Sequence, residues 1–364
     1  MTQTNAADDQ SAADAFINAG GWPAILGAIT TNVDLNERQA RAAMNEILAG
    51  RATNAQIAGL IVGLRLKGES VNELVGLARG MVDSAQLLQL DVDVIDIVGT
   101  GGSVHRQKHA LNVSTMASFV AAGAGARVCK HGNYRASSTS GAFDFLAALG
   151  INVDLEPAQL ERCVTEIGIG FALARTFHPA MRFAGPVRTE LGIPTVFNVL
   201  GPLAHPAQPK RQLIGTANEA LASRMAEVYQ RLGSELAWVV SGAGGLDEIS
   251  TTGPSIIYVA TPNGVRRTEV DVVELGITPP SSMDELAGGG AEDNVAIFER
   301  ILDGTDTGPR HDIVVLNAGA ALAVAGLADD LGQGIEMARA ALADGRVATV
   351  LERLRTFTNQ FAAA

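Results

Sequence analysis

Three consecutive segments near the N-terminus place apolar residues at a helical period of about 3.6 residues, each behind a helix-start signal. A Ser, Thr or Asn that is followed three residues later by Gln or Glu can cap the first turn of a helix reciprocally. The pairs are Asn36 and Gln39, Thr53 and Gln56, and Ser70 and Glu73. Because the connections are only a few residues long, neighbouring helices should pack together, and the pattern predicts an antiparallel helical bundle.

After Ser84 the pattern changes to short β-rich runs, punctuated by glycine and separated by helical patterns. The expected strands are 94–98, 127–129, 236–240, 256–259 and 313–316. This alternation is typical of a mostly parallel sheet covered by helices. The stretch from about His178 to Leu203 is helical in pattern and interrupts the strands.

The expected fold is therefore α/β, with a small N-terminal helical bundle domain and a larger domain whose mostly parallel central sheet is flanked by helices. The expected boundaries are a disordered tail at 1–14, a helical domain at 15–90 joined by about 178–204, and an α/β domain at 91–177 and 205–364. A chain of 364 residues is long enough for two domains that each bury a core.

Composition narrows the class of protein. A formal net charge of −12 argues against a protein that coats nucleic acid, which needs clustered Lys and Arg. The two cysteines, Cys129 and Cys163, have no CxxC or zinc-site spacing, so a reducing cytoplasm is expected. The polar, acidic start lacks the features of a secretory signal, and no apolar run is long enough to span a bilayer.

A glycine-rich turn follows the first expected strand and precedes a helix that begins near Asn112 to Thr115. The turn consists of Gly99, Thr100, Gly101 and Gly102. Small residues let backbone N–H groups approach an anion, and the next helix adds the positive end of its dipole. An ordinary tight strand-to-helix turn gives the same pattern, so this turn alone does not decide for a phosphate site.

A second polar cluster follows the next expected strand. It comprises Lys130, His131, Gly132, Asn133, Ser137 and Ser138. One cation with several hydrogen-bond donors suits a multiply charged phosphate, whereas solvated loop residues and helix caps are the alternative. Both clusters come at the C-terminal ends of successive strands, which is where open α/β sheets bind ligands.

A third cluster, Asp247 and Glu248, lies in a glycine-rich loop after the apolar run 236–240. Adjacent carboxylates can hold Mg²⁺, which prefers a few carboxylates together with water and substrate phosphate oxygens. A solvated acidic turn is the commoner explanation for an isolated pair, but two candidate phosphate loops shift the balance towards a metal.

Several strings of sequence together carry a resemblance to a known family. In chain order they are DIVGTGG, LNVST, KHGN, SSTSGAFDFLAALG, GIGFALARTFHPAM, PVRTELGIPTVFNVLGPL, LIGTA, GLDEIS and VLNAGAAL. From about Ile25 to the C-terminal helix, the chain resembles the anthranilate phosphoribosyltransferases. Thymidine phosphorylase and its relatives share that family's fold, but the GTGG and HPAM strings fit the tryptophan-pathway branch better.

The resemblance implies an enzyme that transfers a phosphoribosyl group from phosphoribosyl diphosphate to the amine of anthranilate during tryptophan synthesis. It implies Mg²⁺ bound through the diphosphate and through Ser114, Asp247 and Glu248, and, by analogy, a homodimer formed through the N-terminal helices. The diphosphate and ribose contacts of the family fall on the glycine turn, on Asn112, Ser114 and Thr115, and on the segment 130–138. Its anthranilate contacts fall on Gly99, Asn133 and Arg188, with His131 and His178 lining the approach.

These roles agree with the chemistry. Displacing diphosphate from the anomeric carbon builds negative charge on the leaving group, which a metal ion and Lys130 would stabilise. An aromatic amine is already neutral near pH 7, so no strong base is required and orientation matters most. Arg188 can hold the anthranilate carboxylate in a bidentate pair, although an arginine on the exposed face of a helix is the plain alternative.

The chain departs from the family around the diphosphate loop. Ser103 stands where the family has an aspartate, Ala110 stands where it has a threonine, and the loop between them is a few residues longer. The longer loop brings in His105, Arg106, Lys108 and His109. Further on, Tyr134 replaces an arginine with Arg135 beside it, Arg175 replaces a proline and Ser241 replaces a histidine.

Changes concentrated around one ligand lead to the hypothesis of altered substrate handling. Two alternatives therefore stay open beside anthranilate transfer. One is a paralogue that transfers phosphoribose to another acceptor or phosphorolyses another substrate. The other is a non-catalytic scaffold that binds a polyanion through the basic loop, against which the acidic balance of the whole chain counts.

Overall fold

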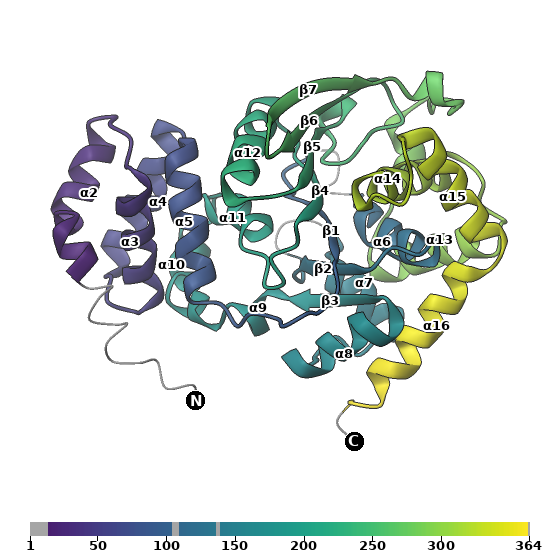
Figure 1. Ribbon diagram of the computed structural model, residues 1–364, viewed down its shortest axis with the longest axis horizontal. Helices are drawn as coiled ribbons and strands as arrows, with labels where there is room; N and C mark the ends of the chain where they lie inside the picture. Colours follow the sequence, from purple (N-terminus) through teal and green to yellow (C-terminus); the bar gives the residue numbers. More distant parts are fainter. Residues whose placement is uncertain (1–13, 104–108, 136–138, 363–364) are drawn as a thin grey trace. The chain divides into compact units, whose positions relative to one another are not determined.

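The computed structural model describes residues 14–103, 109–135 and 139–362 (Figure 1). The chain divides into two compact units, a helical unit of residues 1–87 and 175–206 and an α/β unit of residues 88–174 and 207–364. Residues 14–18 are helical, so the expected N-terminal tail lies, apart from Asp14, outside the described residues.

The helical unit contains the three helices that the capping pairs predict. They are α3 (Glu37–Leu48), α4 (Asn54–Lys67) and α5 (Val71–Asp83), and α2 (Gly21–Thr30) precedes them. Each predicted box is present: the side chains of Asn36, Thr53 and Ser70 accept from the backbone N–H three residues on, and the Gln or Glu there reciprocates. After the first stretch of the α/β unit, the chain returns with α9 (Ala174–Phe177), η1 (Pro179–Phe183), α10 (Gly185–Leu191) and α11 (Phe197–Leu203).

Two glycines one turn apart let α5 pack closely against α3. A Cβ on Gly76 would overlap the Glu37 carbonyl oxygen, and a Cβ on Gly80 would stand 2.7 Å from the Met44 Cβ. The helix interface therefore requires that both positions lack a side chain. Met44 and Ile47 from the predicted apolar stripe of α3 are fully buried there.

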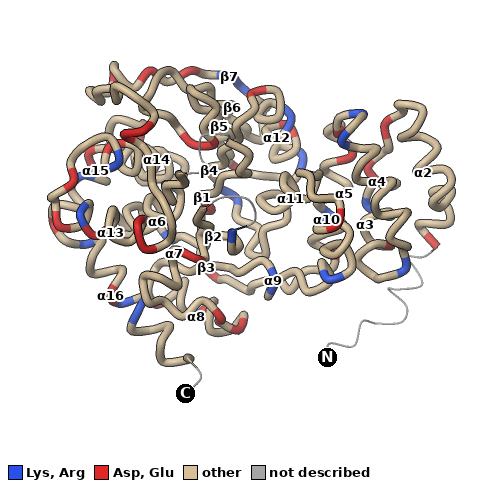
Figure 2. The backbone as a smooth tube through the Cα atoms, turned by 180° about the vertical axis from the view of Figure 1, so that it is seen from behind, with Lys and Arg blue, Asp and Glu red and all other residues tan. Residues whose placement is uncertain are grey.

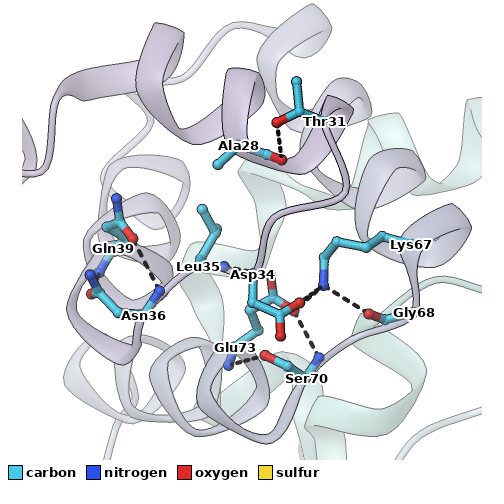
Figure 3. Close-up of polar contacts among 10 residues, drawn as sticks. All are labelled: Ala28, Thr31, Asp34, Leu35, Asn36, Gln39, Lys67, Gly68, Ser70 and Glu73. Atoms are coloured by element: carbon cyan, nitrogen blue, oxygen red, sulfur yellow. Dashed lines mark hydrogen bonds and ion pairs between the residues drawn. The ribbon is translucent and has the colours of Figure 1, made fainter.

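A buried carboxylate ties the α4–α5 connection to the segment before α3 (Figure 3). Glu73 has no exposed surface, and it accepts the N–H of Leu35 at 2.9 Å and that of Ser70 at 2.8 Å. Lys67 pairs with Glu73 at 2.9 Å and also with Asp34. Removing Lys67 would leave the buried Glu73 carboxylate without its counter-ion, which is strongly destabilising.

The α/β unit is built on a seven-stranded sheet with the order β3-β2-β1-β4-β5-β6-β7. The strands are β1 (Ile95–Gly99), β2 (Val128–Gly132), β3 (Ile169–Leu173), β4 (Arg211–Gly215), β5 (Leu236–Ser241), β6 (Ser255–Thr261) and β7 (Gly264–Val270). The first five strands pair in parallel, whereas β6 and β7 pair antiparallel at one end. The sheet is thus mostly parallel, as the alternating pattern predicts.

Helices cover both faces of this sheet (Figure 1). The helices of this unit are α6 (Val113–Gly123), α7 (Ala142–Ala148), α8 (Pro157–Ile167), α12 (Glu219–Leu232), α13 (Ala291–Leu302), α14 (Pro309–Ala325), α15 (Leu331–Ala343) and α16 (Arg346–Asn359), with short 3₁₀ turns at η2 (Ala243–Gly245), η3 (Val272–Leu275) and η4 (Met283–Leu286). Helices α6 and α14 contact the central strand β1, and α12 packs against β5 and β6 from the opposite face.

One expected strand is wrong. The apolar run 313–316 lies inside α14, whose residues from Ile313 to Leu322 are all buried. A helix that is buried on every side shows no polar face, so a short apolar stretch of it cannot be distinguished from a buried strand by periodicity. In contrast, β3, β4 and β7 were not among the expected strands.

Charge is dispersed along the chain. In Figure 2 acidic and basic positions are interspersed in both units, with acidic residues in the majority, in agreement with 39 Asp and Glu against 27 Lys and Arg. Within the described residues, no helix is long and apolar enough to cross a membrane.

Candidate active site

The candidate site lies where the strand order of the parallel sheet reverses. From β1 the chain crosses to β2 on one side, whereas β4 lies on the other side and pairs with β1 through its full length, ending at Gly99 opposite Gly215. The Thr100 N–H extends this pairing to the Gly215 carbonyl oxygen at 2.8 Å. Ligands of open α/β sheets bind at such a switch point, outside the carboxyl ends of the strands.

The glycine turn continues from the end of β1. Gly101 and Gly102 adopt φ values of 74° and 91°, which residues with a side chain rarely adopt. The Gly101 N–H donates to Asp247 Oδ2 at 2.8 Å. The sequence-predicted glycine turn and the sequence-predicted acidic pair, separated by 146 positions, are thus in direct contact.

The acidic loop rests on three glycines at the ends of three strands. A Cβ on Gly99 would overlap Asp247 Oδ2, one on Gly215 would overlap the Asp247 carbonyl oxygen, and one on Gly242 would overlap the Glu248 carbonyl oxygen. Only hydrogen atoms fit at these points, so the strand ends β1, β4 and β5 form the surface on which the loop lies. Sequence reasoning missed Gly215 and Gly242, although each follows an apolar run, as Gly99 does.

The N-terminus of α6 faces the same edge of the sheet. Its N-cap residue, Asn112, makes no capping bond to the helix and instead accepts the Ser140 hydroxyl at 2.8 Å. The first-turn N–H groups therefore lack a side-chain cap, which suits an anion. In the first turn, Ser114 is half-buried and Thr115 is 1% exposed.

Lys130 lies within β2 and is only 2% exposed. Its ammonium donates to the Ile97 carbonyl oxygen of β1 at 2.6 Å. Burial lowers the pKa of Lys130, against the attraction of Asp96 and Asp247, which raises it. Burial likewise raises the pKa of Asp96 to about 7, against the attraction of Lys130. Asp96, which sequence reasoning did not single out, is thus buried together with Lys130 in the strands that lead to the site.

The rest of the second polar cluster divides between buried and exposed positions. The side chain of His131 is buried, with the residue 4% exposed, and its backbone N–H donates to Asp96 Oδ1 at 3.2 Å. Gly132 ends β2, and Asn133 Oδ1 accepts the Tyr134 N–H at 2.9 Å. The expected phosphate ligands Ser137 and Ser138 lie outside the described residues.

Two of the predicted residues, Arg188 and His178, belong to the helical unit. Arg188 on α10 is half-buried with its guanidinium 5.2 Å from the centre of the Phe197 ring. Among the described residues, no carboxylate pairs with it, and burial lowers its pKa. His178 is 5% exposed, and burial lowers its pKa to about 4, so the imidazole is neutral at physiological pH.

The family departures fall at several points of the α/β unit. Ser103 is buried, and residues 104–108, which include His105, Arg106 and Lys108, lie outside the described part. The backbone of His109 and Ala110 bonds to Gly288 and Gly289. The Tyr134 ring packs 5.9 Å from that of Phe143.

The oxygen donors that the protein supplies are too few to hold Mg²⁺ alone, and they suit the ion only when a bound diphosphate supplies further oxygen atoms. Within the described residues, no three His, Cys, Asp or Glu side chains gather into a complete metal site. The metal ligands expected from the sequence are the carboxylates of Asp247 and Glu248 and the hydroxyl of Ser114, all of which are oxygen donors. Mg²⁺ commonly binds through one or two carboxylates, water and substrate phosphates, so these residues fit an ion that arrives with a diphosphate.

Comparison with known proteins identifies the class. Residues 23–85 match the helical bundle domain of a glycosyl transferase family, and residues 91–348 match the α/β domain of the same family. The matches to both domains thus place the chain in a glycosyl transferase family.

Individual relatives narrow the family further. The chain is 45% identical over 359 residues to anthranilate phosphoribosyltransferase from Rhodococcus jostii, covering 97% of this chain and 98% of that protein. It is 47% identical over 327 residues to the enzyme of that name from Roseiflexus castenholzii, covering 90% and 95%. The chain belongs to the anthranilate phosphoribosyltransferase family.

Solved structures agree. The crystal structure of anthranilate phosphoribosyltransferase from Thermus thermophilus matches with a TM-score of 0.85 at 38% identity, covering 92% of this chain and 99% of that one. The Saccharomyces cerevisiae protein, solved in complex with phosphoribosyl diphosphate and Mg, has the same fold, with a TM-score of 0.85 at 24% identity over 93% and 98%.

Proposed function

We propose that this protein catalyses the magnesium-dependent transfer of a phosphoribosyl group from phosphoribosyl diphosphate to the amine of anthranilate. The observation that carries the proposal is the bond from the Gly101 N–H to Asp247 Oδ2 at 2.8 Å, which seats an acidic pair on a glycine turn. That arrangement suits a ligand that brings negative charge and a divalent cation together. Family membership indicates which ligand this is.

In the reaction, the bond from the anomeric carbon to diphosphate breaks, a bond to the anthranilate nitrogen forms, and the nitrogen releases a proton. The glycine turn and the α6 N-terminus, with Asn112, Ser114 and Thr115, bind the diphosphate and ribose. Ser114, Asp247 and Glu248 would hold Mg²⁺, which when bound would neutralise charge on the departing diphosphate. Lys130 adds a fixed positive charge in a dry environment, where electrostatic stabilisation is strongest.

The acceptor needs orientation more than activation. Arg188 is the residue that pairs with the anthranilate carboxylate, and the absence of a carboxylate partner among the described residues supports this role. Asn133, His131 and His178 line the approach. As a neutral imidazole, His178 adds no charge that would compete with Arg188 for the carboxylate.

The test follows the loss of anthranilate fluorescence in the presence of phosphoribosyl diphosphate and Mg²⁺. We expect turnover that EDTA abolishes and excess Mg²⁺ restores. Asp247→Asn combined with Glu248→Gln should lower kcat/KM at least about 100-fold while circular dichroism stays that of the wild type. No turnover of anthranilate by correctly folded wild-type protein would refute the proposal.

A second candidate is transfer to a different aromatic amine. It is favoured by Tyr134, which stands beside Asn133 where the family has an arginine and packs on Phe143. A panel of aromatic amines, assayed by release of diphosphate, distinguishes the two candidates by their kcat/KM values. Salt-sensitive binding of nucleic acid by a protein that binds no phosphoribosyl diphosphate would favour a non-catalytic scaffold instead.

We further propose a homodimer in the cytoplasm. Leu66 and Ile17 of the helical unit are 83% and 70% exposed, which supports burial of this unit against a second copy. Cys129 and Cys163 are both buried thiols that form no disulfide with each other, in keeping with a reducing compartment. Sedimentation equilibrium tests the dimer, and a Leu66→Glu variant should shift it towards monomer.

A further inference from the structure

Two buried asparagines outside the proposed contact residues each bind the backbone of one segment of the site. Asn317 on α14 is 3% exposed, and Asn294 on α13 has no exposed surface. A buried amide is costly unless its donors and acceptor are satisfied. Both amides are satisfied by main-chain groups, which include groups of the two segments that carry the proposed metal and diphosphate ligands.

Asn317 holds the residue that follows the acidic pair. Its Oδ1 accepts the Ile249 N–H at 2.9 Å, and its Nδ2 donates to the Ile249 carbonyl oxygen at 2.9 Å and to Ile313 at 2.8 Å. One side chain therefore bonds both polar groups of one backbone residue, as a neighbouring strand would. The shared peptide fixes Glu248 as well, because the Ile249 N–H belongs to the peptide group that begins at Glu248.

Two kinds of contact thus hold the acidic pair. The loop lies against Gly99, Gly215 and Gly242, and Asn317 on α14 anchors the residue that follows the pair. Removal of the amide would leave the N–H and carbonyl of Ile249, which is itself fully buried, without these bonds. The loop would then relieve that cost by shifting towards water.

Asn294 holds the start of α6 in the same manner. Its Oδ1 accepts the N–H of Asn112, the N-cap of α6, at 2.9 Å. Its Nδ2 donates to the Ala110 carbonyl oxygen at 2.8 Å and to that of Gly290 at 2.8 Å. The segment before the α6 N-terminus is therefore fastened to α13, and neither Asn294 nor Asn317 is a proposed ligand of substrate or metal.

We infer that Asn317 and Asn294 are positioning residues for the two halves of the site, Asn317 for the acidic pair and Asn294 for the N-terminus of α6. The inference rests on the proposed function for its kinetic readout. Partners behind metal and substrate ligands typically change affinity or activity about 10- to 100-fold when they are removed. The two amides divide this task between the metal and the diphosphate.

The experiment compares Asn317→Ala and Asn294→Ala with Asn152→Ala in the full-length protein. Asn152 is the matched control because its amide also bonds a backbone carbonyl of the α/β unit, that of Thr358 on α16 at 3.2 Å. Steady-state kinetics give kcat, the KM for each substrate and the half-saturating Mg²⁺ concentration. Hydrogen exchange of peptides covering 109–116 and 246–251 reports how firmly each segment is held, without any substrate.

We expect Asn317→Ala to raise the half-saturating Mg²⁺ concentration about 10-fold and Asn294→Ala to raise the KM for phosphoribosyl diphosphate about 10-fold. The KM for anthranilate should stay within about twofold of wild type. Exchange should accelerate at 246–251 in the first variant and at 109–116 in the second, with Asn152→Ala unchanged at both.

Uniformly faster exchange over the whole unit, or losses in Asn152→Ala equal to those of the other variants, would reduce both amides to ordinary core groups and overturn the inference. Unchanged exchange in both segments would overturn it too. An inactive wild type would instead refute the proposed function, and the exchange arms would still decide whether the amides hold these segments.

Discussion

Replacing Gly215 by alanine tests whether the strand ends fix the acidic pair. The added Cβ would overlap the carbonyl oxygen of Asp247 and would stand 3.0 Å from the Glu248 nitrogen. Because these are backbone atoms, no rotamer change relieves the clash. The loop must move by about 1 Å or more, and a shift of that size can cost about 100-fold in rate. Overpacking itself costs about 1–3 kcal/mol of stability.

We therefore expect Gly215→Ala to lower kcat/KM at least about 100-fold while the protein stays folded. Anthranilate fluorescence gives the rate, and urea unfolding separates loss of stability from loss of activity. Gly27→Ala is the control, since a Cβ at that position of α2 meets nothing within 4 Å. Activity of Gly215→Ala within about threefold of wild type would refute the claim that β4 positions Asp247.

Three further predictions concern single side chains. Glu73→Ala should cost about 3–5 kcal/mol in urea unfolding, because it removes the buried partner of Lys67 and leaves the Leu35 and Ser70 N–H groups without their acceptor; a loss below about 1 kcal/mol would contradict this. The pKa of His178 falls from 6.5 to about 4 on folding, so the unfolded chain binds the extra proton between these values. Stability should thus fall by up to about 3 kcal/mol as pH drops from 6.5 to 4, and His178→Gln should show a smaller fall; equal pH slopes would exclude His178 as the cause. Arg188→Lys should raise the KM for anthranilate about 10-fold with the KM for phosphoribosyl diphosphate unchanged, and an unchanged anthranilate KM would remove Arg188 from the acceptor site.

Local patterns in the sequence predicted the helical unit well. The Asn36, Thr53 and Ser70 capping boxes depend on residues three positions apart, and all three are present. The mostly parallel sheet also follows from the alternation of runs. The run 313–316 misled because burial on all sides removes the polar face from which a helix is recognised.

The sequence identified candidate residues of the site but could not show which of them lie together. The glycine turn and the acidic pair are each visible as short motifs, yet their contact spans 146 positions and depends on the strand order. Gly215, Asn294 and Asn317 gave no local signal of their own, because a glycine after a strand or an asparagine in a helix is unremarkable until its long-range neighbour is known. Asp96 was not predicted as a site residue for the same reason, because the local sequence does not show that it lies close to Lys130.

A common principle connects these groups: the charged residues at the sheet edge are held largely by main-chain atoms. Asp247 accepts the Gly101 N–H, and Lys130 donates to the Ile97 carbonyl oxygen. A directly paired counter-ion would cancel the charge of such a group. Main-chain dipoles orient the group but leave its charge uncancelled. In the proposed mechanism, the acidic pair would therefore attract a cation, and Lys130 would act on an anion, with little reorganisation when ligands bind. Such preorganisation is the main source of electrostatic catalysis, and the glycines and buried amides around these residues contribute to it by fixing the backbone.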